Sequence, residues 1–478
     1  MVIRPGGRNE RSYPLPITIL EHQLNAENDV LLPLIIPVNA VFNMKVFKFG
    51  GASVRDAAGV RNVASILQRF ADEQLVIVIS AMGKTTNALE AVVAAHNKQD
   101  GAAHDLFQGV KEQHYTLMRD LFDENDEVFT LVNDVFVEAE WVLDEPPAQN
   151  YDYMYDQLVC VGELASTRIV AAYLNKAGLK THWLDARDVI VTDNTYREGW
   201  VLWDKTKPNA QRIIPPILAQ GGFVLSQGFI GSTTENFTTT LGREGSDYSA
   251  AIFAFCLDAE GMYIWKDVPG VLTADPRLFD NVLKLDRLSY MEAIEMTYYG
   301  ASVIHPKTIK PLQNKNIPLY VKSFIDPDGA GTEISSDLDM TYPPIVVVEK
   351  NQVLLHISTI DYSFVAEQHM ARLFHILAEL RIFVNMMQNT AISFSICVPN
   401  IPDRVQKFID EVADEFKIKT EEGLELITIR HFTDDIIQSL KKGKIVLFEE
   451  RLRNTLQMVV RDVPLMERKA VELERSKG

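Results

Sequence analysis

Met44-Lys-Val-Phe-Lys-Phe-Gly-Gly51 predicts a buried β-strand, Lys45–Phe49, that ends in a glycine turn. Similar short apolar runs recur along the chain, and between them lie segments in which apolar residues have helical spacing, such as Gly59–Phe70. Further predicted strands are Leu75–Ile79, Phe223–Leu225, Met262–Trp265 and Leu319–Val321. Apolar strands that alternate with helices are typical of an α/β fold, in which helices cover both faces of a mainly parallel sheet.

Polar residues come directly after several of these strands, at the point where the strand ends. Gly50-Gly51 follow the first strand, Ser80 the second, and Lys266-Asp267 the strand Met262–Trp265. Because ligands bind beyond the carboxyl ends of the strands in open α/β sheets, we expect a binding site there. The two glycines would let the backbone approach a phosphate, and Lys48 would place a positive charge beside it. Taken alone, two glycines after a strand are more often a simple turn.

The stretch Leu241-Gly-Arg-Glu-Gly-Ser-Asp247 lies just before the apolar run Ala250–Cys256, which predicts a helix. Ser246 or Asp247 would be a natural N-cap, and the N-terminus of a helix favours anions. A cap alone does not explain why Arg243 and two glycines lie so close together. The stretch therefore predicts a turn that brings an anionic ligand to the start of the helix.

The composition limits the classes of function. The chain has 478 residues, which corresponds to roughly three domains. Lys and Arg number 47 against 65 Asp and Glu, and the net charge of −18 argues against nucleic acid or an anionic membrane as the main partner. No apolar run reaches the roughly 18 residues of a membrane span. Cys160, Cys256 and Cys397 lie far apart in apolar runs, which is typical of reduced thiols in a cytoplasmic protein. No cluster of His, Cys and carboxylates has the spacing of metal ligands.

The sequence changes character at several points along the chain. Residues 1–43 differ in character from the rest of the chain, and we expect a loosely ordered N-terminal extension. Residues 44–330 form the predicted α/β body. Within it, residues 96–150 are strongly acidic and predict a helical insertion with long helices at His104–Phe122 and Asp126–Leu143.

Two smaller α/β modules are predicted after the body. Residues 345–422 contain the order strand, helix, strand, strand, helix, strand, which is that of a ferredoxin-like βαββαβ unit. Residues 423–478 form a second, shorter unit that lacks one edge strand, and the strand predicted at Ile345–Val348 could supply it. We therefore expect the two modules to interleave.

Several motifs together resemble those of the aspartate kinases, which are members of the amino acid kinase family. They occur in the order found in that family, and the C-terminal pair of modules resembles its tandem ACT modules. The matching segments are Lys48–Val54, Ser80–Asn87, Gly162-Glu163, Gly242–Ala250, Trp265–Arg277 and Gly300–Pro306. The resemblance implies the amino acid kinase fold, a three-layer αβα arrangement, followed by two ACT modules.

The resemblance also implies an activity: ATP-dependent phosphorylation of the side-chain carboxylate of L-aspartate to 4-phospho-L-aspartate. This is the first step towards lysine, threonine and methionine. A carboxylate is already a nucleophile, so the enzyme needs no general base and has to hold two anions in line. Mg²⁺ would arrive with ATP and be bound mainly by phosphates and water, so no protein metal ligand is expected.

The same resemblance implies roles for individual residues. Lys48 would steady the transferring phosphoryl group, and Asp247 would orient Lys48. Arg243 would hold the α-carboxylate of aspartate in a fork, and Glu163 would bind its ammonium group. The other expected aspartate-binding residues are Ser80, Thr86 and Ser246. The other expected nucleotide-binding residues are Phe49, Gly50, Gly51, Lys266, Asp267, Leu272, Arg277 and Ser302.

Some positions depart from the family pattern. Lys266 stands where many bacterial relatives have a small hydroxyl residue, and Ser302 where many have a nucleotide-binding lysine. In the first ACT module, His369 replaces a glycine and Asn385 replaces an acidic residue of the lysine-sensitive relatives. A ligand ammonium group favours a carboxylate, so we expect weak or absent inhibition by lysine.

Two alternatives compete with an aspartate kinase. A kinase for another small carboxylate, such as acetylglutamate, is disfavoured by the ACT-like tail. A catalytically inactive amino-acid sensor is disfavoured because Lys48, Glu163, Arg243 and Asp247 are all present. We further expect a homodimer that forms through the ACT modules, located in the cytoplasm and without nucleic-acid or membrane partners.

Overall fold

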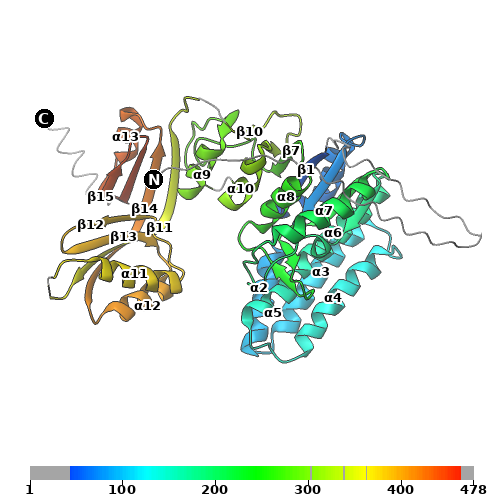
Figure 1. The fold of residues 1–478 in the computed structure, drawn as a ribbon, viewed down its shortest axis with the longest axis horizontal. Helices are drawn as coiled ribbons and strands as arrows, with labels where there is room; N and C mark the ends of the chain where they lie inside the picture. The colour runs from blue at the N-terminus through cyan, green and yellow to red at the C-terminus, as the bar shows by residue number, and fades with distance from the viewer. Residues whose placement is uncertain (1–43, 302–303, 337–339, 362, 464–478) are drawn as a thin grey trace, which may run out of the picture. The chain divides into compact units, whose positions relative to one another are not determined.

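The computed structural model describes residues 44–301, 304–336, 340–361 and 363–463 (Figure 1). The expected N-terminal extension, Ser302 and the end of the second predicted module lie outside these ranges.

The first sheet has eight strands, and neighbouring strands pair in parallel except for β9 and β10. Its strands are β1 (Met44–Phe49), β2 (Gln74–Ile79), β3 (Thr181–Leu184), β4 (Phe223–Gln227), β7 (Gly261–Lys266), β8 (Arg287–Ser289), β9 (Leu319–Ser323) and β10 (Thr332–Ser335). They lie in the order β3-β4-β2-β1-β7-β9-β10-β8. The predicted mainly parallel α/β sheet is confirmed. β1 and β2 lie inside it with both faces covered, which explains their continuous apolar sequence.

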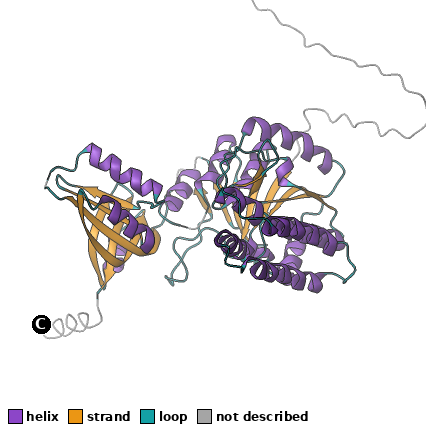
Figure 2. Ribbon diagram, turned by 90° about the horizontal axis from the view of Figure 1, so that it is seen from below, coloured by secondary structure: helices purple, strands orange, loops and turns teal. Residues whose placement is uncertain are grey.

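Helices cover both faces of this sheet, as Figure 2 shows. The helices are α1 (Ala57–Gln68), α2 (Thr85–Lys98), α3 (Ala103–Leu121), α4 (Val128–Asp144), α5 (Tyr151–Val159), α6 (Val161–Lys176), α7 (Trp203–Leu218), α8 (Gly245–Cys256), α9 (Tyr290–Tyr298) and α10 (Pro306–Lys315). Two short 3₁₀ turns, η1 (Gly51–Val54) and η2 (Ala186–Asp188), and a hairpin of β5 (Ile230–Ser232) and β6 (Thr238–Thr240) complete this body.

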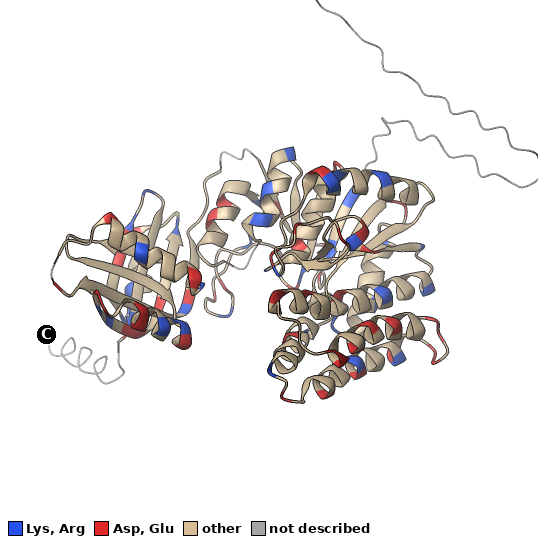
Figure 3. Cartoon of the chain, turned by 60° about the horizontal axis from the view of Figure 1, so that its bottom comes forward, with Lys and Arg blue, Asp and Glu red and all other residues tan. Residues whose placement is uncertain are grey.

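The acidic insertion forms the two helices α3 and α4, close to the predicted bounds. α3 packs on α2, and α4 packs on α6. Phe107 and Met118 of α3 and Val132 and Phe136 of α4 are buried. Acidic residues of both helices are exposed, among them Asp105, Glu112, Asp120, Asp134 and Glu138; Figure 3 draws the acidic residues in red. The insertion is therefore a further packed layer.

The stretch Tyr151–Lys176, which comprises α5 and α6, is long and apolar enough by composition to cross a membrane. However, 78% of its most apolar window is buried inside the protein. Packing in the core accounts for its apolar character.

The C-terminal residues form a second sheet of six antiparallel strands in the order β12-β13-β11-β14-β16-β15. Its strands are β11 (Ile345–Thr359), β12 (Met386–Asn389), β13 (Ser393–Pro399), β14 (Phe416–Arg430), β15 (Lys444–Arg451) and β16 (Thr455–Asp462). Its helices are α11 (Glu367–Glu379), α12 (Pro402–Val412) and α13 (Asp434–Lys441). The arrangement matches the predicted pair of ferredoxin-like modules.

The two modules share β11 and β14, each of which is a single strand of 15 residues. The sequence indicated separate strands because Glu349–Gln352 and the residues around Gly423 are polar or turn-forming. In the structure, Asn351 and Gly423 have φ angles of 57° and 69°, and the register of the pair shifts beside them. These bulges keep the pairing continuous through polar sequence.

The first sheet continues past residue 330, where we expected the body to end. Thr332–Ser335 form β10, which pairs with both β8 and β9. β10 contains a single apolar residue, Ile334, so the sequence shows no apolar run that would predict a strand there.

Candidate active site

A cavity of about 830 Å³ lies at the carboxyl ends of β1, β2 and β7. This is the position that the polar strand ends predicted. The volume falls within the range of small-molecule sites. The expected site residues that line it are Lys48, Gly51, Ser80, Thr86, Glu163, Arg243, Ser246, Asp247 and Lys266.

Lys48 and Asp247 form an ion pair in this cavity. Lys48 lies near the end of β1 and Asp247 in the first turn of α8, and Nζ is 2.6 Å from Oδ1. Their side chains are only 11% and 6% exposed. Apart from this ion pair, Oδ1 has no hydrogen-bond partner among the described residues. A buried ammonium group held by one carboxylate can turn towards a phosphate with little reorganisation.

The start of α8 differs from the prediction. The N-cap is Glu244, with φ 54° and no side-chain capping bond, whereas Ser246 and Asp247 lie within the first turn. The prediction of a Ser246 or Asp247 cap is therefore wrong. Close packing is the reason: a Cβ on Gly245 would lie 2.6 Å from the Phe229 ring. Glu244, in the left-handed conformation, directly precedes this contact, and Asp247 in the following turn pairs with Lys48.

The glycine turn after β1 joins the loop after β2. Gly83 donates its N–H to the carbonyl of Gly51 at 3.0 Å. A Cβ on Gly51 would lie 2.7 Å from the Ala81 oxygen, so only glycine fits. Gly50 is less constrained, because its nearest neighbour would be Lys48 Nζ at 3.3 Å. The two loops together form one wall of the cavity.

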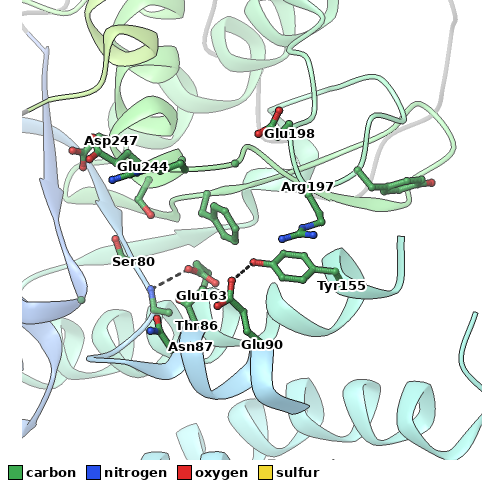
Figure 4. A pocket seen from close by; sticks show the side chains of 18 of the residues that line it. Ser80, Thr86, Asn87, Glu90, Tyr155, Glu163, Arg197, Glu198, Glu244 and Asp247 are labelled. Atoms are coloured by element: carbon green, nitrogen blue, oxygen red, sulfur yellow. Dashed lines mark hydrogen bonds between the residues drawn. The ribbon is translucent and has the colours of Figure 1, made fainter. Parts of the chain in front are cut away.

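Glu163 lies in α6 and is buried, so it is not the solvated or capping residue that a lone glutamate usually is. Oε1 accepts a hydrogen bond from the Ala81 N–H at 3.4 Å, while Oε2 has no partner among the described residues. Burial raises the pKa of Glu163 to about 8. Figure 4 shows its side chain beside those of Glu90 and Thr86. An unpartnered buried carboxylate of this kind fits a cationic group such as an ammonium.

A second wall of the cavity was not predicted from the sequence. It consists of side chains from α2, α5 and the loop before α7, several of which Figure 4 labels. They are Glu90, Asp152, Tyr155, Thr195, Tyr196, Arg197 and Glu198. These residues lie outside the segments that resemble the motifs of the family, and the signal in the sequence was the density of polar and aromatic residues in Thr195–Glu198. Arg381, from the C-terminal sheet body, also lines the cavity.

Some expected nucleotide-binding residues do not line this cavity. Phe49 is buried and stacks on Trp265, so its side chain belongs to the core. Arg277 is largely exposed and pairs with Asp275. Asp267 and Leu272 lie on the same long loop after β7, outside the lining. Their nucleotide contacts remain predictions, as does that of Ser302. Among the described residues, no group of three or more His, Cys, Asp or Glu could hold a metal ion.

Comparisons with known proteins identify relatives of the chain. A model of the amino acid kinase family matches residues 43–323. Lysine-sensitive aspartokinase 3 of Escherichia coli (strain K12) is 30% identical over 416 residues, which cover 84% of this chain and 89% of that protein. Aspartokinase 1, chloroplastic, of Arabidopsis thaliana is 32% identical over 386 residues, which cover 78% of this chain and 67% of that protein. The crystal structure of E. coli aspartokinase III with aspartate and ADP matches with a TM-score of 0.74 and 26% identity, over 87% of this chain and 96% of that one.

Proposed function

The chain belongs to the amino acid kinase family and is an aspartate kinase, and on this premise we propose how its residues carry out the reaction. The enzyme transfers the γ-phosphoryl group of ATP to the side-chain carboxylate of L-aspartate. The observation that carries the assignment of roles is the buried pair of Lys48 and Asp247, which lines one cavity together with Glu163 and Arg243.

Lys48 stabilises the phosphoryl group as it moves between donor and acceptor. The negative charge spread over the phosphoryl oxygens needs a fixed cation in a site that excludes water. Asp247 keeps the ammonium group of Lys48 in place by the 2.6 Å contact. The glycine turn Gly50-Gly51 lets the backbone approach the phosphates, and Lys266 adds a second positive charge to the lining.

Glu163 and Arg243 hold the amino-acid end of aspartate. The unpartnered Oε2 of Glu163 receives the ammonium group of the substrate, which lowers the high pKa of this carboxyl in the complex. Arg243 binds the α-carboxylate with two parallel hydrogen bonds. Ser80, Thr86 and Ser246 donate further hydrogen bonds from the lining. The side-chain carboxylate is then left to attack the phosphorus.

Mg²⁺ accompanies ATP in this proposal. Phosphate oxygens and water would be the main ligands of this ion. When bound, the ion neutralises phosphate charge. The protein contributes Lys48 and Lys266 to the same task.

The ACT modules are proposed to form a homodimer. β12 is an edge strand of the second sheet, and Met387 within it is exposed. Phe383 and Ile392, which lie just before and just after β12 in the sequence, are exposed, and so is Phe364, whose neighbour Val365 donates its N–H to the Ala391 carbonyl. An open strand edge with exposed apolar side chains favours pairing with a second copy. The cytoplasm is the proposed location, which fits three buried, free cysteines.

The activity is tested by measuring ADP release from MgATP with different acceptors. We expect release with L-aspartate and only background release with N-acetyl-L-glutamate or without an acceptor. Release with acetylglutamate alone would support the other kinase. No release with any acceptor, from folded protein, would support an amino-acid sensor.

A further inference from the structure

Asp156 is a fully buried carboxylate to which the reaction assigns no role. It lies in α5 and is 0% exposed. Its Oδ2 accepts hydrogen bonds from the backbone N–H groups of Arg197 and Thr240, both at 2.9 Å. Its Oδ1 accepts a third from the Thr240 hydroxyl at 2.7 Å. One carboxylate thus joins three segments of the chain: α5, the loop before α7, and the end of β6.

Two of these segments lead directly to arginines of the cavity. Thr240 ends β6, and the next residues are Leu241, Gly242 and Arg243. The loop before α7 packs against this turn, because a Cβ on Gly242 would lie 3.1 Å from the Arg197 oxygen. Asp156 therefore fixes the loop of Arg197 and the turn of Arg243 relative to each other.

The backbone of Arg197 is held in an unusual conformation. Its φ angle is 66°, in the left-handed region that residues with a Cβ rarely adopt. The hydrogen bond from its N–H to Asp156 helps to hold it there. Such conformations persist where several surrounding contacts hold the backbone in place, and they are common at ligand sites.

The side chain of Arg197 is also held against the cavity wall. Nη1 contacts Asp152 Oδ1 at 3.2 Å, and the guanidinium carbon lies 4.3 Å from the centre of the Tyr155 ring. The Tyr155 hydroxyl in turn donates to Glu90 Oε1 at 2.7 Å. Figure 4 shows Arg197 and Tyr155 on the opposite side of the view from Asp247. The guanidinium is thus at the end of the cavity away from the phosphoryl-binding pair.

The wall is rich in carboxylates, so the binding of an anionic acceptor requires a positively charged side chain to offset their repulsion. Four carboxylates line the wall around the amino-acid end: Glu90, Asp152, Glu163 and Glu198. One of them, Glu163, serves the ammonium group of aspartate, and Asp152 is already paired with Arg197. The other two, Glu90 and Glu198, would repel the α-carboxylate of aspartate. Arg197 and Arg243 are the arginines of the catalytic body that line the cavity among the described residues.

We propose that Asp156 is a positioning residue of the acceptor site, which holds Arg197 and the turn of Arg243 so that two guanidinium groups face the non-reacting carboxylate of aspartate. The inference rests on the proposed aspartate kinase activity and extends it by one binding residue, Arg197, and one positioning residue, Asp156.

The test compares steady-state kinetics of Asp156→Asn with those of the wild type. An amide cannot accept all three hydrogen bonds, so the KM for aspartate should rise about 10-fold or more. The KM for ATP and kcat should change less than about threefold, since the phosphoryl-binding pair is untouched. An unchanged KM for aspartate would overturn the proposal.

The matched control is Asp193→Asn in the same loop. Asp193 also accepts backbone hydrogen bonds, from Thr195 and Trp200, but it does not line the cavity. Both KM values of this variant should stay within about twofold of the wild type. A rise equal to that of Asp156→Asn would mean that any disturbance of the loop has the same effect, which would overturn the specific role.

A second variant, Arg197→Gln, keeps the proposal testable if Asp156→Asn does not fold. Arg197 is partly exposed, so this substitution should not prevent folding. It removes the charge and should raise the KM for aspartate by a similar factor while the KM for ATP stays unchanged. An unchanged KM for aspartate, or equal rises for both substrates, would contradict the role of Arg197. Absence of activity in the wild type would instead refute the proposed function.

Discussion

Lys48 Nζ, near the end of β1, lies 2.6 Å from Asp247 Oδ1 in the first turn of α8. These residues are 199 positions apart in sequence, and the parallel sheet brings them together at its carboxyl edge. The pair is almost fully buried, so each charge depends on the other for its stability. A phosphoryl group that enters the cavity meets a cation already fixed in place.

Lys48→Ala should lower kcat by roughly 10²–10³, which is typical for the loss of one preorganised electrostatic contact. The KM for aspartate should change much less, because Lys48 does not hold the amino-acid end. The control is Lys45→Ala in the same strand, whose ammonium group pairs with Glu73 away from the cavity. Near-normal turnover of Lys48→Ala would rule out its assigned role.

Arg243→Lys should weaken aspartate binding far more than ATP binding. Lysine cannot reproduce the two parallel hydrogen bonds that a guanidinium makes to a carboxylate. The measurement is the KM for each substrate at saturating concentration of the other. Equal losses for both would point to a structural role of Arg243 in the turn before α8.

Glu163 should make stability depend on pH in a defined direction. Its pKa is about 8 in the folded protein against an ordinary value of 4.5, because burial disfavours the charge. Between these values the folded state binds the proton more tightly than the unfolded state. The contribution of Glu163 to the free energy of unfolding is therefore largest below pH 4.5 and is lost as the pH rises to about 8.

Glu163→Gln removes this titration, so the variant should gain stability relative to the wild type between pH 5 and pH 8. Urea unfolding at several pH values measures the difference. A constant difference across this range would show that the pKa of Glu163 is not raised.

Arg430→Met should destabilise the protein by about 3 kcal/mol, because it removes the guanidinium group from the buried carboxylate of Glu292 and leaves it with the His431 ring, whose Nε2 lies 3.1 Å from Oε2. Arg430 in β14 contacts Glu292 in α9 through two hydrogen bonds of 2.8 and 2.7 Å, and both side chains are buried. The control is Arg451→Met, since Arg451 is exposed and lies 3.9 Å from Asp434. That variant should change stability by less than about 0.5 kcal/mol. Equal effects in thermal unfolding would contradict this account of the contact.

Inhibition by lysine should be weak or absent. Asn385 stands where an acidic residue is expected in lysine-sensitive relatives, and its amide already donates to Glu349 at 2.8 Å and Gln352 at 3.0 Å. Loss of a charge-assisted contact costs about 1.5–3 kcal/mol, or roughly 10- to 150-fold in affinity. Titration of lysine at sub-saturating aspartate measures this. Half-inhibition well below millimolar lysine would show the interpretation to be incorrect.

The fold of the catalytic body could be predicted from the sequence because its central strands, β1, β2, β4 and β7, are continuous apolar runs, as expected for a buried parallel sheet. The sequence also predicted the two C-terminal modules, but it divided β11 and β14 into separate strands. The reason is that a bulge at Asn351 allows polar residues inside a continuous strand. Periodicity cannot distinguish such a bulge from a turn.

The candidate site was predicted where residues belong to motifs and missed where they do not. Lys48, Glu163, Arg243 and Asp247 line one cavity as expected. Arg197 and Tyr155 lie in ordinary-looking sequence, and only tertiary packing brings them to the same wall. The N-cap of α8 was missed because contact with Phe229 determines the turn.

Trapping of the product with hydroxylamine tests the central claim most directly. The protein is incubated with MgATP, L-aspartate and hydroxylamine, and ADP and aspartyl hydroxamate are quantified in the same sample. We expect one hydroxamate for each ADP, both strongly reduced in Lys48→Ala. ADP without hydroxamate, or undiminished hydroxamate formation by Lys48→Ala, would contradict phosphoryl transfer to the aspartate side chain at this site.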